Sequence, residues 1–150
     1  GCSACCGKTV SGLVANRRTK LATVVCHPWG PLGGSMLDPT VSALVSLVGQ
    51  GLGLTTLRFN FRSGIGRGHS PAADVRGACH HLCHSLRQPA EQILLIGYSY
   101  GAAVVASIAA DIPEVCAFVL VGPPLDFGRA LFTGRSPITA SLLTSTKPKL

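Results

Sequence analysis

The sequence predicts an α/β fold in which a mostly parallel sheet carries helices on both faces. Three observations predict it: short apolar runs rich in β-branched residues, segments of helical period between them, and a regular alternation of the two. Apolar residues make up 47% of the chain and charged residues only 13%, which excludes a disordered chain and favours buried strands. The 150 residues suffice for one domain with a sizeable core and are too few for two.

Four segments have the length and composition of buried strands. They are Leu21–Cys26, Leu54–Phe59, Gln92–Gly97 and Val115–Val121. The first is expected to stop at His27-Pro28, because proline has no N–H to donate to the ladder. An alternating stretch at Thr9–Ala15 is a candidate edge strand.

Three helices are expected between these strands. The first begins at Asp38-Pro39-Thr40, runs through Val48, and ends in a glycine-rich stretch. The second extends from about Pro71, a proline in the first turn, to Leu86. The third covers Tyr100–Ala110 and is rich in alanine and valine. Because strands and helices alternate, we expect a parallel sheet with helices on both faces.

Charge and hydropathy indicate which kinds of partner the chain does not bind. The formal net charge is +7, but the basic residues are spread along the chain without a basic run interleaved with aromatics, so we expect no nucleic-acid partner. The longest uncharged run, Gln92–Ala110, has Gly97-Tyr98-Ser99-Tyr100-Gly101 at its centre. A strand, a turn and a buried helix account for it better than a membrane helix does, so we expect no membrane partner.

The seven cysteines are odd in number, and four of them fall within predicted strands or helices. This usage is typical of free thiols in a reducing compartment. The N-terminal residues lack an apolar stretch behind a basic flank, so no signal peptide is expected. Together these features predict a cytoplasmic location.

The most specific motif is Gly97-Tyr98-Ser99-Tyr100-Gly101, a G-x-S-x-G pattern between an apolar strand and an alanine-rich helix. In that context the serine sits on a strained turn, and glycines without Cβ let strand and helix approach closely. The start of the helix also favours negative charge near Ser99. Ser99 is therefore the candidate nucleophile; the alternative is a buried structural serine in a glycine-rich turn.

Acyl transfer would also need two backbone N–H donors for an oxyanion. Tyr100, directly after the candidate nucleophile, provides one. Trp29, in the loop after the first buried strand, is the second candidate, with Gly30 as the near alternative. A plain proline turn is the other interpretation of this loop. The side chains of Tyr98 and Tyr100 either line a pocket or pack in the core.

The segment Cys79-His80-His81-Leu82-Cys83-His84 is rich in potential metal ligands. On a helix, Cys79 and Cys83 share one face and His80 and His84 another. A closed zinc site needs four ligands, and no second pair has suitable spacing, so we expect no metal and a helix packed on the sheet. We interpret Gly64–Gly68 as a turn near the sheet edge, not as a phosphate loop, with Arg62 anchoring it through carbonyl hydrogen bonds.

Several segments together resemble the α/β-hydrolase superfamily, in particular its small, lid-poor dienelactone-hydrolase-like and serine-aminopeptidase-like members with an His-Pro oxyanion loop. The segments occur in the family's order within residues 9–126 and are Val24–Pro28, Gly33–Met36, Leu57–Arg62, Gly64–Gly68 and Gly97–Gly101. The resemblance implies a serine hydrolase of ester, amide or related acyl substrates that uses no cofactor and has a small-molecule acyl substrate as its partner.

The resemblance also implies an acid after a later strand and a final histidine. No histidine follows Ser99, and Asp126 is the candidate acid although the family's acid usually follows the next strand. We therefore expect a single incomplete domain over 1–150, with a frayed end at 1–8, a matching core at 9–126, and a connection at 127–150 toward a missing strand. The acid and histidine are then expected beyond Leu150.

Two alternatives stay open besides hydrolysis. A non-catalytic α/β-hydrolase-like scaffold or binding protein fits the missing histidine, and acyl transfer to an acceptor other than water uses the same residues. Substrate identity and oligomeric state have no signal in the sequence.

Overall fold

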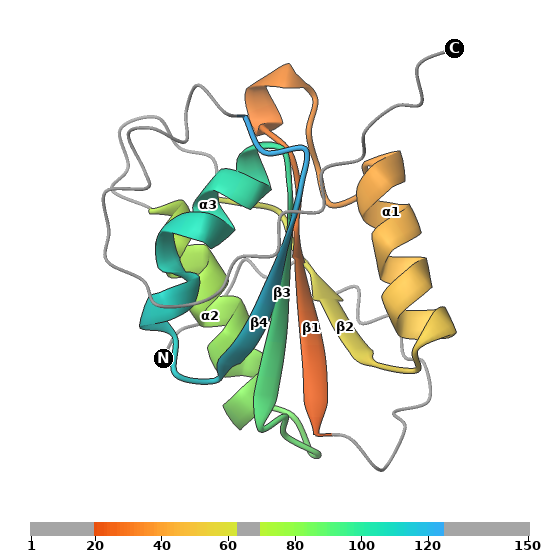
Figure 1. Ribbon diagram of the computed structural model, residues 1–150, viewed down its shortest axis with the longest axis vertical. Coiled ribbons are helices and arrows are strands. Elements are labelled where there is room, and N and C mark those ends of the chain that lie inside the picture. The colour runs from red at the N-terminus through yellow and green to blue at the C-terminus, as the bar shows by residue number, and fades with distance from the viewer. Residues whose placement is uncertain (1–19, 63–69, 125–150) are drawn as a thin grey trace.

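The computed structural model describes residues 20–62 and 70–124, which contain one sheet of four parallel strands (Figure 1). The strands are β1 (Leu21–Cys26), β2 (Thr55–Arg58), β3 (Gln92–Tyr98) and β4 (Val115–Val121). Their order in the sheet is β2-β1-β3-β4, so β1 and β3 are the inner strands and each has a parallel neighbour on both sides. The predicted parallel sheet is confirmed, whereas the candidate edge strand at 9–15 and the segments 64–68 and 127–150 lie outside the described residues.

Three helices cover the sheet on both faces, as predicted (Figure 1). The helix α1 (Pro39–Ser46) lies on one face, and α2 (Pro71–His84) and α3 (Tyr100–Ile108) lie together on the other. Short helical turns follow β1 at Gly30–Leu32, extend α1 at Leu47–Gly51 and end α3 at Ala109–Asp111.

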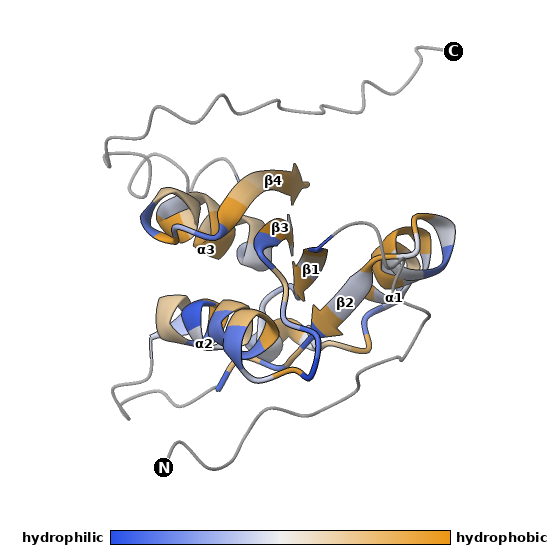
Figure 2. Cartoon of the chain, turned by 90° about the horizontal axis from the view of Figure 1, so that it is seen from below, coloured by the Kyte–Doolittle hydropathy of each residue, from blue (hydrophilic) through white to orange (hydrophobic). Residues whose placement is uncertain are grey.

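The core is split in two by the sheet. Val24 of β1 packs with α2 and α3, while its neighbour Val25 packs with α1, and both are fully buried. This alternation follows from the two-residue period of a strand, and burial on both faces explains why β1 is apolar almost throughout. Figure 2 shows the strands as mostly hydrophobic, whereas α2 carries hydrophilic and hydrophobic residues side by side.

Two predicted boundaries need correction. The first helix does start at Asp38, whose carboxylate accepts hydrogen bonds from the N–H groups of Thr40 (2.8 Å) and Val41 (3.4 Å). Its α-helical part ends at Ser46, however, and continues as a wider π-helical turn to Gly51. The second strand pairs with β1 only over Thr55–Arg58, so the buried flanking residues of the predicted segment 54–59 lie outside the ladder.

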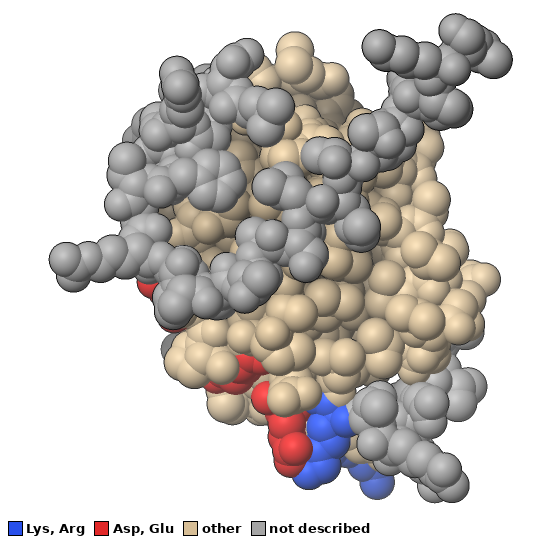
Figure 3. All heavy atoms as spheres, in the orientation of Figure 1, with Lys and Arg blue, Asp and Glu red and all other residues tan. Residues whose placement is uncertain are grey.

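On the face seen in Figure 3, the visible charged side chains of the described residues lie toward the bottom, where the strands begin. Lys20 and Glu91, which precede β1 and β3, form an ion pair there. Among the helices of the described residues, none has the length and apolar character that a membrane crossing requires.

Candidate active site

Ser99 occupies a strained bend between β3 and α3. Its backbone has φ 52° and ψ −115°, and it is the one non-glycine residue with positive φ in the described part of the chain. Such a conformation costs about 1–3 kcal/mol and persists only where the surroundings enforce it. Here the Ser99 N–H donates to the carbonyl of Val121 at the end of β4 (2.9 Å). The bend therefore stands at the carboxyl edge of the sheet, with Ser99 half-buried.

The two glycines of the motif make this bend sterically feasible. A Cβ on Gly97 would lie 2.5 Å from the Cα of Ala102, and a Cβ on Gly101 would lie 2.5 Å from the carbonyl oxygen of Cys26 and 2.7 Å from that of His27. Neither position has room for any side chain. The close approach at Gly101 brings the start of α3 against the beginning of the loop after β1.

Backbone N–H groups are available on both sides of that contact. Ala102 and Ala103 both donate to the Ser99 carbonyl (3.0 and 3.3 Å), whereas the Tyr100 N–H is among the first amides of α3, which have no intrahelical acceptor. The helix N-terminus adds partial positive charge at the same place.

The loop after β1 holds Trp29 at its tip. The Trp29 carbonyl accepts from Leu32 (3.2 Å) and Gly34 (3.0 Å), which closes the turn at Gly30–Leu32. The turn is tight, because a Cβ on Gly34 would lie 2.4 Å from the Pro28 oxygen. Trp29 is 47% exposed and so is not needed for the core. Its N–H and that of Gly30 belong to the loop that Gly101 contacts.

The two tyrosines of the motif do not line one pocket. Tyr100 packs edge-on against Phe61 (ring centroids 5.8 Å apart) on the side of α2 and α3. Burial raises the pKa of its phenol, so the group stays neutral. Tyr98 packs with Ile96 on the opposite face of the sheet. The Tyr100 ring is thus a packing group.

His27 is buried, with 3% of its surface exposed, and both ring nitrogens are engaged. Nε2 accepts a hydrogen bond from the Phe61 N–H (3.0 Å), and Nδ1 pairs with the Pro28 carbonyl. Burial lowers the pKa of His27 below its ordinary value, despite opposing effects of the Pro28 carbonyl and Asp38. A histidine with no free nitrogen is not placed to take a proton from Ser99.

His84, at the end of α2, lies at the other edge of the sheet. His84 approaches Glu114 (3.8 Å), and the Glu114 carbonyl accepts from Ile93 near the start of β3 (2.7 Å). Ser99 follows β3, six residues after Ile93, which corresponds to about 20 Å of strand. Asp111 is likewise held away, by Arg76 (3.4 Å). Among residues 70–124, therefore, no histidine or carboxylate joins Ser99, and Asp126 lies outside the described residues.

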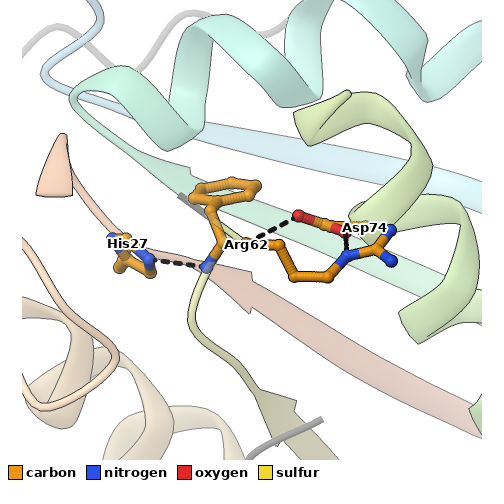
Figure 4. Close-up of polar contacts among 4 residues, drawn as sticks. His27, Arg62 and Asp74 are labelled. Carbon is orange, nitrogen blue, oxygen red and sulfur yellow. Dashed lines mark hydrogen bonds and ion pairs between the residues drawn. The ribbon is translucent and has the colours of Figure 1, made fainter. Parts of the chain in front are cut away.

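Arg62 is anchored differently from our expectation of carbonyl hydrogen bonds. Its backbone N–H donates to one carboxylate oxygen of Asp74 (2.9 Å) and its Nε to the other (2.5 Å), as Figure 4 shows. The Asp74 side chain is only 5% exposed. The role of Asp74 was missed, because an acid in the first turn of a helix is ordinarily explained by the helix dipole.

The cysteine- and histidine-rich segment is divided between two sides of α2. Cys79 and Cys83 are buried in the core, and burial raises the pKa of the Cys79 thiol to about 12. His80 and His84 are exposed, with ring centroids 4.5 Å apart. In the part of the chain that the structure describes, no three histidine, cysteine or acidic side chains come together as metal ligands would.

Comparison with known proteins extends these observations. No protein-family model and no curated protein sequence matches the chain. Solved structures do match. An α/β serine hydrolase homologue from Coxiella burnetii superposes with a TM-score of 0.62 and 28% identity, over 81% of this chain and 59% of its own. An α/β serine hydrolase without a lid from Xanthomonas campestris gives 0.60 and 27%, over 74% and 53%.

An esterase from Pyrococcus furiosus, with a TM-score of 0.62 and 20% identity over 72% of this chain and 45% of its own, shares the fold. The parallel sheet with helices on both faces, and with a strained serine between β3 and α3, defines a protein of the α/β class. Within that class, the chain belongs to the α/β-hydrolase superfamily. It spans between 45% and 59% of the length of these three structures.

Proposed function

We propose that the chain carries the nucleophile half of a serine hydrolase acting on ester, amide or related acyl substrates. Ser99 is the nucleophile in this proposal. The observation that carries it is the strained backbone of Ser99 at the carboxyl edge of the sheet, in contact through Gly101 with the loop after β1. A backbone conformation that costs free energy is commonest where it serves a reaction.

The proposed chemistry follows the acyl-transfer scheme. Ser99 Oγ bonds to the acyl carbon while a base takes its proton, and the carbonyl oxygen becomes an oxyanion. The N–H groups of Tyr100 and Trp29 donate to that oxyanion, each worth about 3–4 kcal/mol of barrier in comparable sites. The leaving group departs with a proton, and water then releases the acyl group from Ser99.

The base and its acid partner are proposed to come from sequence beyond Leu150, with Asp126 as the alternative acid. The positions of His27, His84 and Glu114 support this proposal, because each is engaged elsewhere. The hydrolase names of the similar structures from Coxiella burnetii and Xanthomonas campestris support the reaction class.

A fluorophosphonate probe applied to the full-length protein tests the proposal, since it labels only an activated serine. Ser99→Ala is expected to abolish labelling. Ser107→Ala is the matched control, because Ser107 lies on the same helix and its hydroxyl donates to the Val104 carbonyl of that helix (2.7 Å). Labelling that survives Ser99→Ala rejects Ser99 as nucleophile, and absence of labelling in the wild type favours the non-catalytic scaffold.

A further inference from the structure

The hydrogen bonds of His27 determine its tautomer. The Phe61 N–H can only donate, so Nε2, at 3.0 Å, must be unprotonated. The Pro28 carbonyl can only accept, so Nδ1 must carry the proton. The ring is therefore neutral. Protonation of Nε2 would place its N–H against the Phe61 N–H, and neither group could accept a hydrogen bond from the other.

These bonds tie together segments that are distant in the sequence. His27 opens the loop that holds Trp29, and Phe61 belongs to the segment after β2, 34 residues away (Figure 4). The Phe61 ring lies 4.8 Å from the His27 ring and 5.8 Å from Tyr100. The next residue, Arg62, is held to α2 by Asp74. One imidazole thus links the loop after β1 to a segment that both α2 and α3 hold in place.

We propose that His27 is a positioning residue that keeps the Trp29 loop beside Ser99 when the ring is neutral, and that protonation of Nε2 releases this loop. The inference rests on the proposed function in one respect, namely that the loop supplies the second oxyanion donor. The latch itself, defined as the hydrogen bond between Phe61 N–H and His27 Nε2, is a property of the fold.

The surroundings of His27 set the pH range. Asp38 at the start of α1 attracts the imidazolium, Arg62 is neutralised by Asp74, and Tyr100 of α3 is uncharged. Burial outweighs the attraction by Asp38 and the Pro28 carbonyl and lowers the pKa of His27 from 6.5. A lowered folded-state pKa means that the unfolded chain binds the proton more readily. The neutral His27 therefore makes its full contribution to the stability of the fold above about pH 6.5, and this contribution is lost as the pH falls toward the folded-state pKa of His27.

Trp29 provides a direct readout, because it is the single tryptophan of the chain and lies two residues after His27. The experiment follows Trp29 fluorescence of the full chain from pH 8 to pH 4, with far-UV circular dichroism recorded in parallel. Wild type is expected to show a shift in the emission maximum with a midpoint below 6.5, while the circular dichroism stays constant. A flat emission profile down to the pH at which the fold is lost would overturn the proposal.

His27→Gln separates the hydrogen bond from the titration. The glutamine amide oxygen can accept from the Phe61 N–H and does not ionise in this range. The emission shift is expected to disappear in His27→Gln and to persist in His84→Gln, the control at the opposite edge of the sheet. Persistence of the shift in His27→Gln would show that another group drives it.

A measurement on the wild type needs no variant to fold. A long-range ¹H–¹⁵N spectrum at neutral pH is expected to show His27 protonated at Nδ1 and unprotonated at Nε2; the reverse tautomer rejects the latch. Neither this spectrum nor the emission shift requires catalysis. If Ser99 is not labelled by the fluorophosphonate, the proposed function fails while both latch measurements still decide the inference.

Discussion

Gly101 lies in direct contact with the backbone of His27. A Cβ at Gly101 would come 2.7 Å from the His27 carbonyl oxygen, closer than real Cβ atoms approach backbone atoms. The second glycine of the motif is therefore required by tertiary packing between α3 and the loop after β1, and the turn itself does not need it. This contact joins the Ser99 bend and the Trp29 loop into one unit.

Gly101→Ala should disrupt the contact between the Ser99 bend and the Trp29 loop. Because the clash is with backbone atoms of Cys26 and His27, which cannot rotate away, we expect the free energy of unfolding to fall by about 1–3 kcal/mol. Fluorophosphonate labelling of Ser99 should fall as well. Urea denaturation measures the first effect. Gly77→Ala is the control, since a Cβ there meets nothing within 4 Å and should stabilise α2 by up to about 1 kcal/mol. Equal losses in both variants would contradict the contact.

Ser99→Gly should stabilise the fold. Glycine adopts φ 52° without the strain that serine bears. The strain energy that is released exceeds the free-energy cost of the greater flexibility that glycine gives the unfolded chain. We expect an unfolding free energy about 1 kcal/mol higher than that of Ser99→Ala, which keeps the strain. Thermal or urea denaturation of the two variants gives the comparison. A less stable glycine variant would show that the bend is not strained.

Asp74→Ala should cost more than Asp111→Ala, although both remove a carboxylate bound to an arginine. The Asp74 side chain is 5% exposed and accepts from the Arg62 N–H as well as from Nε, whereas that of Asp111 is 65% exposed. We expect losses of about 1–3 kcal/mol for Asp74 and under about 1 kcal/mol for Asp111. Denaturation at two salt concentrations checks this, with only the Asp111 loss shrinking at high salt.

Asp38→Ala should remove the cap of α1. The carboxylate accepts from Thr40 and Val41, and losing these bonds typically costs about 0.5–2 kcal/mol. Ser70 precedes α2 in the same position, but its side chain makes no capping hydrogen bond. Ser70→Ala is thus expected to leave the melting temperature nearly unchanged. A comparable loss in both variants would mean that the two caps are equivalent.

Thiol alkylation should follow burial. Burial raises the pKa of Cys79 to about 12 and that of Cys26 well above its ordinary value, so both are protonated and inaccessible at pH 8. Cys116 is exposed. Iodoacetamide followed by peptide mass spectrometry is expected to find Cys116 modified in the native protein and the other two only in denaturant. Modification of Cys79 at the rate of Cys116 would show that the core opens.

Local patterns predicted the elements well. β1 and β4 have the predicted bounds, because β-branched apolar runs ended by proline or glycine are decided by nearby residues. The predicted end of α1 and the length of β2 were less accurate, since the π-helical turn at Leu47–Gly51 and the extent of the ladder depend on what these segments pack against.

The alternation of strands and helices and the candidate nucleophile at Ser99 could be predicted from the residues alone. The first depends on periodicity, and the second on glycines only two residues from the serine. Which side chains meet across long sequence separations depends on how the chain folds. The fold brought Phe61 to His27 and Arg62 to Asp74, and it placed His84 at the opposite edge. The physical reason is that a parallel sheet gathers the carboxyl ends of its strands at one edge, so sheet order and helix face, which no local pattern encodes, determine which residues can act together.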